Sequence, residues 1–301
     1  VNNWAGIKLL KRKFPENYIY TACTGRCGQH SLGDFINRHA LNTSVEVEPP
    51  QLLYPNNAPF GNHLRNFQRK WIFTDEMLGR GKALQWYRDG DNDRLTRLSR
   101  ARLRRVHRLC SRQKSQTYFE ISKFFIRTYF KVTHDINPDI GILILKRDPM
   151  NNAKSFANRH KDFRLDNLLP HERNVILQMD GKHFSPYQLY LWQWCELELR
   201  TLQFISSRNI LRYYELYNSD LNDPMKIFEM LNFFSIEHQP FDAMHSLQPI
   251  NTNLENGFDH TVLTAEDFMD FEIFLDMLPG KYRDQLSSLD EWHIKYKAAG
   301  F

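Results

Sequence analysis

Long apolar runs are missing from this sequence. No stretch approaches the ~18 to 20 consecutive apolar residues that a transmembrane helix needs. The first residues, VNNWAGIKLLKRK, also lack the long apolar core of a secretory signal peptide. We therefore expect no membrane segment in this chain and a cytoplasmic location.

Cysteine is scarce, with 4 residues in a chain of 301. Three residues separate Cys23 from Cys27, instead of the two of common metal-binding or redox pairs. The 12 histidines show no spacing typical of metal ligands. The sequence thus predicts reduced thiols and no metal site.

The composition that is present is that of a globular chain. It is 42% hydrophobic and 14% aromatic, which is enough to bury a full core. The formal net charge of +5 is mild, so it suggests anionic partners such as phosphate or sulfate esters without requiring nucleic acid. No linker or shift in composition divides the chain. We predict one domain over residues 1–301.

Three short apolar segments are each followed by a turn and a helical pattern. They are Tyr18–Cys23, Ile140–Arg147 and Ile210–Leu216, and the second is apolar throughout, as expected of a parallel strand covered on both faces. Strands that alternate with helices imply a doubly wound, mostly parallel sheet flanked by helices. The sequence therefore predicts an α/β fold.

A strongly basic segment, Asp93–Lys114, has apolar residues at helical spacing and predicts an amphipathic helix. Its arginines have two interpretations, a solvated face or a face that attracts an anionic ligand. They are Arg94, Arg97, Arg100, Arg104, Arg105, Arg108 and Arg112.

The segment TGRCGQHSL follows the first predicted strand and leads into a helix. A glycine turn before a helix N-terminus binds phosphate or sulfate oxygens through backbone N–H groups and the helix dipole. It is not a Walker loop, because Cys23 and Gln29 stand where that motif has its first glycine and its lysine, and His30 replaces the Mg²⁺-binding hydroxyl. Metal-assisted nucleotide hydrolysis is thus disfavoured.

The same segment resembles the sulfotransferase family that uses 3′-phosphoadenosine 5′-phosphosulfate (PAPS). The family's 5′-phosphosulfate loop has a basic residue, a serine or cysteine, a glycine, two hydroxyl residues and, two positions later, a leucine. Arg26, Cys27, Gly28 and Leu32 match this pattern, whereas Gln29 and His30 replace the two hydroxyl residues. Either side chain can still donate a hydrogen bond.

A second motif supports the resemblance. The family holds the 3′-phosphate of PAPS with an arginine after a buried strand and a serine eight residues later, and Arg147 and Ser155 have this spacing. An arginine engages a phosphate through two parallel charge-assisted bonds. The segments Thr117–Phe130 and Tyr213–Phe234 also resemble the family. The resemblance implies a P-loop NTPase-like sulfotransferase architecture, with PAPS as donor co-substrate and no metal.

The resemblance also implies the site residues. The general base is expected shortly after the first helix, where Glu46 and Glu48 stand two positions apart and so face one side of a strand; we favour Glu48. Lys123 is expected to stabilise the leaving phosphate, and His30 to donate to the sulfuryl group. The residues predicted to bind PAPS are Arg26, Cys27, Gly28, Gln29, His30, Ser31, Arg147 and Ser155.

The predicted function is transfer of the sulfuryl group of PAPS to a hydroxyl or amine of a small-molecule or glycan acceptor. One alternative is a nucleotide or small-molecule kinase on the same P-loop-like fold. The other is a non-enzymatic protein that binds anions or nucleic acid through the Arg94–Arg112 face, although no nucleic acid is expected as partner.

Overall fold

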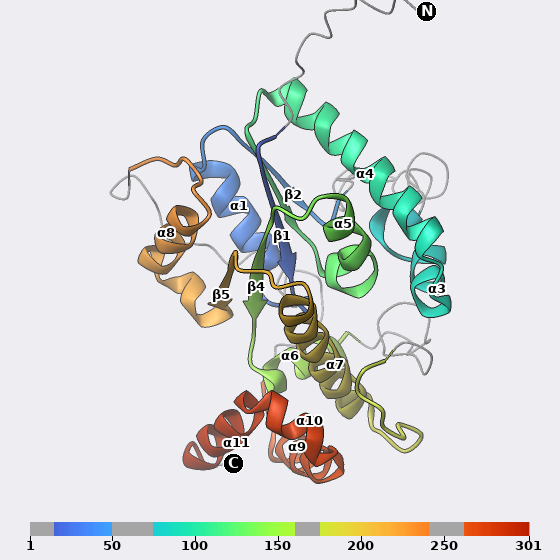
Figure 1. Cartoon of the computed structure of the whole chain (residues 1–301). Helices are drawn as coiled ribbons and strands as arrows, with labels where there is room; N and C mark the ends of the chain where they lie inside the picture. The colour runs from blue at the N-terminus through green and yellow to red at the C-terminus, as the bar shows by residue number, and fades with distance from the viewer. Residues whose placement is uncertain (1–14, 50–74, 160–174, 241–261, 301) are drawn as a thin grey trace, which may run out of the picture.

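The computed structural model describes residues 15–49, 75–159, 175–240 and 262–300, which surround a five-stranded sheet (Figure 1). The strand order is β2-β3-β1-β4-β5, and every pair of neighbours is parallel. This confirms the predicted doubly wound α/β fold. The strands are β1 (Asn17–Ala22), β2 (Thr43–Val47), β3 (Thr117–Ile121), β4 (Ile140–Lys146) and β5 (Tyr213–Tyr217).

Helices occupy the connections between the strands and follow the last of them (Figure 1). The α-helices are α1 (Gln29–His39), α3 (Lys82–Asp89), α4 (Asn92–Gln113), α5 (Phe130–Ile136), α6 (Pro149–Ala157), α7 (Pro186–Ser207), α8 (Pro224–Phe233), α9 (Ala265–Met277), α10 (Gly280–Arg283) and α11 (Ser288–Ala298). Single turns are η2 (Asp75–Leu78), η3 (Phe125–Tyr129), η4 (Asn218–Asn222) and η7 (Asp284–Leu286), of which η3 is a π-helical turn.

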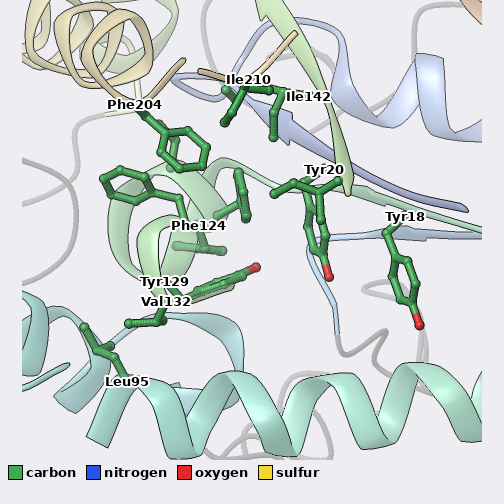
Figure 2. Packing of buried hydrophobic residues seen from close by; sticks show 14 of the residues in the cluster. Tyr18, Tyr20, Leu95, Phe124, Tyr129, Val132, Ile142, Phe204 and Ile210 are labelled. Carbon is green, nitrogen blue, oxygen red and sulfur yellow. The ribbon is translucent and has the colours of Figure 1, made fainter. Parts of the chain in front are cut away.

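Both faces of the sheet are buried, which explains why its central strands are apolar without alternation. In β1, Ile19 packs with Phe35 of α1 and with residues of α8. Tyr18 and Tyr20 point to the opposite face and join a cluster that includes Phe204 of α7 (Figure 2). The two faces are thus covered by α1 and α8 on one side, and by α4, α5 and α7 on the other.

Two helices begin at residues that cap them. Ser185 forms a capping box with Gln188 at the start of α7, and Asp223 accepts a hydrogen bond from the N–H of Met225 at the start of α8. The strand predicted from Ile210 begins instead at Tyr213. Ile210 is buried in the core beside α7, so its apolar character reflects packing and not strand pairing.

The C-terminal helices cover α6 and α7 at the carboxyl end of the sheet (Figure 1). Phe271 and Phe274 of α9 are fully buried in one cluster with Trp194 of α7 and Ala153 of α6. The cluster fixes α6, the helix that carries Ser155.

All four cysteines are buried and none forms a disulfide, in agreement with the predicted free thiols. None of the helices in the described ranges combines the length and the apolarity that a membrane crossing requires. Residues 1–14, on which the signal-peptide expectation rests, lie outside the description.

Candidate functional site

The strand order places the two predicted phosphate motifs beside each other. From β1 the chain runs through α1 to β2 at one edge of the sheet, whereas from β4 it runs through α6 and α7 to β5 at the other edge. Because β1 and β4 are adjacent, their carboxyl ends form the point where the connections diverge, which is where sheets of this type bind ligands. Arg26 follows β1 and Arg147 follows β4 at this point.

The loop between β1 and α1 has an unusual backbone. Gly25, Arg26 and Gly28 have φ angles of 93°, 61° and 86°, in the left-handed region that non-glycine residues rarely adopt. Helix α1 begins at Gln29, so Gln29, His30 and Ser31 form its first turn. The N–H groups of a first helical turn have no acceptor within the helix, and they attract anions.

The two motifs are in direct contact. The Nε atom of Arg26 donates a hydrogen bond to the Oγ atom of Ser155 at 3.1 Å, and the Nη1 atom of Arg147 donates to the carbonyl oxygen of Arg26 at 3.0 Å. Ser155 is buried on α6. Sequence spacing alone did not indicate that the predicted 5′- and 3′-phosphate residues touch.

Positive charge is concentrated at this contact. Burial lowers the pKa of Arg26 to about 10, and the neighbouring charges of Arg159 and Arg147 add to the effect. The guanidinium group stays protonated at neutral pH, but its charge is destabilised by its surroundings. A bound anion would relieve this repulsion, since an opposite charge favours the ionised form.

Cys27 and Gln29 differ in the groups that they leave available to bind a ligand. The side chain of Cys27 lies in the core against Leu32 and donates to the carbonyl oxygen of Gly25, so only its backbone is left for the predicted role in binding. Gln29 is 5% exposed, and its Nε2 atom has no hydrogen-bond partner within the described part of the chain. A buried donor without an acceptor costs free energy, which an anion at the loop would offset.

A Cβ atom at Gly28 would lie 2.4 Å from Cδ1 of Leu221 and 2.7 Å from Nδ2 of Asn218. Because η4 packs directly against Gly28, the structure leaves no room for a side chain at this position.

Glu48 and Lys123 form an ion pair beside the loop, with side-chain exposures of 29% and 19%. They follow β2 and β3, and the N–H of Glu48 donates to the carbonyl oxygen of Ile121 at 3.0 Å. Burial acts to raise the pKa of Glu48, but the charge and the hydrogen bond of Lys123 outweigh it and lower the pKa to about 2. Burial also lowers the pKa of Lys123, against the influence of Glu48.

The charges of Glu48 and Lys123 affect the pKa of His30. Burial lowers the pKa of its imidazole, while the charge of Glu48 acts in the opposite direction and those of Lys123 and Arg26 act with burial. The ring is therefore neutral at pH 7 and has one donor and one acceptor nitrogen.

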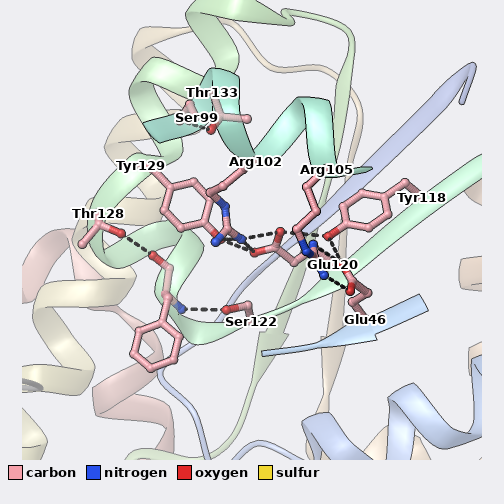
Figure 3. A network of polar contacts seen from close by, with 11 residues as sticks. Glu46, Ser99, Arg102, Arg105, Tyr118, Glu120, Ser122, Thr128, Tyr129 and Thr133 are labelled. Carbon is pink, nitrogen blue, oxygen red and sulfur yellow. Dashed lines mark hydrogen bonds and ion pairs between the residues drawn. The ribbon is translucent and has the colours of Figure 1, made fainter. Parts of the chain in front are cut away.

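The expectation that Glu46 shares the orientation of Glu48 is wrong. Glu46 is buried beneath α4, where its Oε2 atom accepts hydrogen bonds from Arg105 at 2.7 Å and from Tyr118 at 2.9 Å (Figure 3). The strand ends at Val47, and the φ angle of 50° at Glu48 breaks the alternation of side chains. Glu46 is thus a structural carboxylate.

The solvated-face interpretation of the basic helix fails for only one of the seven arginines that it named, Arg105. Arg105 points toward the sheet, and Arg102 binds both carboxylate oxygens of Glu120 at 2.8 and 2.9 Å (Figure 3). Glu120 pairs with Glu46 in the register of β2 and β3, so two buried carboxylates face two arginines of α4. The arginines that are exposed are Arg94, Arg97, Arg100, Arg104, Arg108 and Arg112.

Sequence reasoning missed Arg127, Asn152 and Arg159, which also lie close to the loop. Arg127 and Asn152 donate to loop carbonyl groups, and Arg159 is the charge that most lowers the pKa of Arg26. One signal was available, because Asn152 precedes Ser155 by three positions and so shares its side of the helix. Among the described residues, no group of histidine, cysteine and acidic side chains has the arrangement of a metal site.

Comparison with models of protein families and with curated proteins finds no match to this sequence. Solved structures that are similar include a sulfotransferase from Alicyclobacillus acidocaldarius, with 14% identity over 89% of this chain and 98% of the other and a TM-score of 0.42. The sulfotransferase domain of the Synechococcus PCC 7002 olefin synthase has 13% identity over 88% and 97% of the two chains and a TM-score of 0.44. A Mycobacterium avium sulfotransferase has 13% identity over 87% and 76%, also at 0.44. Each of these three solved proteins is described as a sulfotransferase or a sulfotransferase domain.

Proposed function

We propose that this protein is a PAPS-dependent sulfotransferase that acts on a hydroxyl or amine of a small-molecule or glycan acceptor. The observation that carries the proposal is the hydrogen-bonded set of Arg26, Arg147 and Ser155, where the connections from β1 and β4 diverge. Two motifs separated by more than a hundred residues meet there, in the order and with the spacing of the sulfotransferase pattern.

The residues present fit a donor with two anionic ends. Arg147 and Ser155 would hold a 3′-phosphate, while Arg26 and the first-turn N–H groups of α1 would hold the 5′-phosphosulfate. PAPS, when bound, supplies an activated sulfuryl group. Arg26 and Gln29 offer donors to the charge that develops on its oxygens, in surroundings largely excluded from water.

Glu48 is the proposed general base. It is ionised at neutral pH and can take the proton of an acceptor hydroxyl, although a carboxylate with a pKa near 2 is a weak base. An anion that binds beside Lys123 would compete for its charge and raise the pKa of Glu48, so donor binding would strengthen the base. Lys123 would then face the leaving phosphate, and the neutral His30 would donate a hydrogen bond to the sulfuryl group.

The kinase alternative lacks support in the loop itself. The Walker lysine position holds Gln29, and the Mg²⁺-binding hydroxyl position holds the neutral His30. The nucleic-acid alternative loses Arg105 from its basic face, because Arg105 is paired with the buried Glu46, whereas the other six arginines of that face are exposed. The single-domain organisation and the cytoplasmic location stay predictions.

Isothermal titration of the intact protein with 3′-phosphoadenosine 5′-phosphate (PAP), the desulfonated product, tests the proposal. We expect saturable binding of PAP without Mg²⁺ and no competition from ATP with Mg²⁺. Binding of ATP with Mg²⁺ together with failure to bind PAP would establish the kinase alternative. Screening of hydroxyl and amine acceptors with ³⁵S-labelled PAPS then identifies the acceptor class.

A further inference from the structure

Three consecutive carbonyl groups of the β1–α1 loop are each held by a side chain from a different part of the fold. Arg127 of η3 donates from Nη2 to the carbonyl oxygen of Thr24 at 2.7 Å. Asn152 of α6 donates from Nδ2 to that of Gly25 at 2.8 Å, and Arg147 donates from Nη1 to that of Arg26 at 3.0 Å. Among the described residues, no backbone N–H is hydrogen-bonded to these three carbonyl groups, and side chains donate to them instead. The carbonyl oxygen of Gly25 also accepts from Thr24 Oγ1 and Cys27 Sγ within the loop.

The contacts of Arg127 and Asn152 with the loop are well shielded from water. Arg127 is 3% exposed and Asn152 is 0% exposed, so competition from solvent is weak and each bond orients its carbonyl group firmly. Arg26 itself has a φ angle of 61°, in the left-handed region that is strained for a residue other than glycine. The side chains that hold the neighbouring carbonyl groups compensate for this strain.

The orientation of the carbonyl groups decides where the amide groups point. In a trans peptide the C=O of one residue and the N–H of the next are antiparallel. Since the carbonyl groups of Gly25 and Arg26 are turned toward Asn152 and Arg147, the N–H groups of Arg26 and Cys27 point away from those side chains. Successive N–H groups beside a left-handed residue form a concave anion-binding arrangement.

Arg127 is held in turn by α7. Arg200 donates from Nη1 to the carbonyl oxygen of Arg127 at 3.0 Å and is paired with Glu196 at 2.6 Å. The other carboxylate oxygen of Glu196 accepts the N–H groups of Ile176 and Leu177, both at 2.9 Å. A continuous set of polar contacts thus connects the loop to α7.

We propose that Arg127 and Asn152 are positioning residues, which hold the loop carbonyl groups so that the amides of Arg26 and Cys27 face the 5′-phosphate end of the nucleotide. The proposal rests on the proposed function for the identity of the anion. The two residues would act on the nucleotide through the loop, without contacting the nucleotide themselves.

The test compares two ligands on the same variants by calorimetry. PAP carries both phosphates, whereas adenosine 3′-phosphate lacks the 5′-phosphate that the loop would bind. In Asn152→Leu, which keeps the side-chain volume and removes the donor, we expect PAP to bind at least tenfold more weakly and adenosine 3′-phosphate to bind as in the wild type. Asn152→Leu also removes the contact of Nδ2 with Cys27 Sγ at 3.6 Å. Ser99→Ala is the control for the loss of a buried side-chain hydrogen bond, because it removes the bond to Thr133, outside the loop.

A second pair of variants keeps the proposal testable if Asn152→Leu does not fold. Arg127→Lys preserves the charge and one donor, so it should recover PAP affinity relative to Arg127→Met. Equal PAP affinity in these two variants, or equal weakening of both ligands by Asn152→Leu, would overturn the positioning role. Failure of the wild type to bind PAP would instead overturn the proposed function.

Discussion

The Nε atom of Arg26 donates a hydrogen bond to the Oγ atom of Ser155, at a distance of 3.1 Å. The two residues come from the loop after β1 and from α6, and they were assigned to opposite ends of the nucleotide. Their contact means that the two proposed phosphate sites adjoin each other. A nucleotide would have to replace this hydrogen bond with stronger, charge-assisted ones.

Removal of either arginine should weaken nucleotide binding. A hydrogen bond to a charged group contributes roughly 1.5 to 3 kcal/mol, so Arg26→Ala and Arg147→Ala should each raise the Kd for PAP about 10- to 100-fold. Arg100→Ala, an exposed arginine of α4, is the control and should leave the Kd unchanged. Unchanged PAP affinity in both folded loop variants would show that these motifs do not bind the nucleotide.

Gly28→Ala should reduce stability as well as activity. The new Cβ would meet Leu221 and Asn218 at less than 3 Å, and the φ angle of 86° adds strain. Together these effects should cost about 2 to 4 kcal/mol of unfolding free energy, measured by urea denaturation. Gly90→Ala separates them, because Gly90 has a φ angle of 71° but nothing within 4 Å of the added Cβ. Equal losses in the two variants would mean that packing against η4 is unimportant.

Glu48→Gln preserves the shape of the proposed base and removes its charge. We expect kcat to fall roughly 10²- to 10⁴-fold with little change in PAP affinity. Full kcat in Glu48→Gln, with activity abolished in His30→Ala or Lys123→Ala, would move the role of base to that other residue.

The same carboxylate predicts how stability depends on pH. Its pKa is lowered from the ordinary 4.5 to about 2 in the folded protein, so the unfolded chain binds the proton more readily. The stabilisation is fully present above pH 4.5 and is lost as the pH falls toward 2. Urea titrations of the wild type between pH 6 and 3 should show a steeper decline in unfolding free energy than those of Glu48→Gln. If the unfolding free energies of the two proteins declined equally with pH, Glu48 would not contribute to the pH dependence of stability.

The buried pair of Arg102 and Glu120 should matter far more than the exposed charges of α4. Arg102→Met leaves the carboxylate of Glu120 buried without its cation and should cost about 3 to 5 kcal/mol of unfolding free energy. Arg104→Met, on the exposed side of the same helix, should change it by less than ~0.5 kcal/mol. Similar small changes in both would contradict the structural role of the pair.

The sequence by itself determined the alternation of strands and helices, because burial on both faces leaves continuous apolar runs and helix starts have local signals such as Ser185 and Asp223. It also predicted Arg26, Arg147 and Ser155 as phosphate-binding residues, since their spacing is a local property of two motifs. The predicted start of β5 was three residues too early, because Ile210 is apolar for reasons of packing and not of strand pairing.

Only the tertiary structure decided which polar side chains meet. The orientation of Glu46 toward Arg105, the ion pair of Glu48 with Lys123 and the contacts of Arg127 and Asn152 with the loop all join residues far apart in the sequence. Side-chain periodicity describes one element at a time, whereas these contacts depend on the register of β2 against β3 and on the packing of η3, α4 and α6 against the sheet. Charge alone therefore did not distinguish a solvated arginine from a buried one.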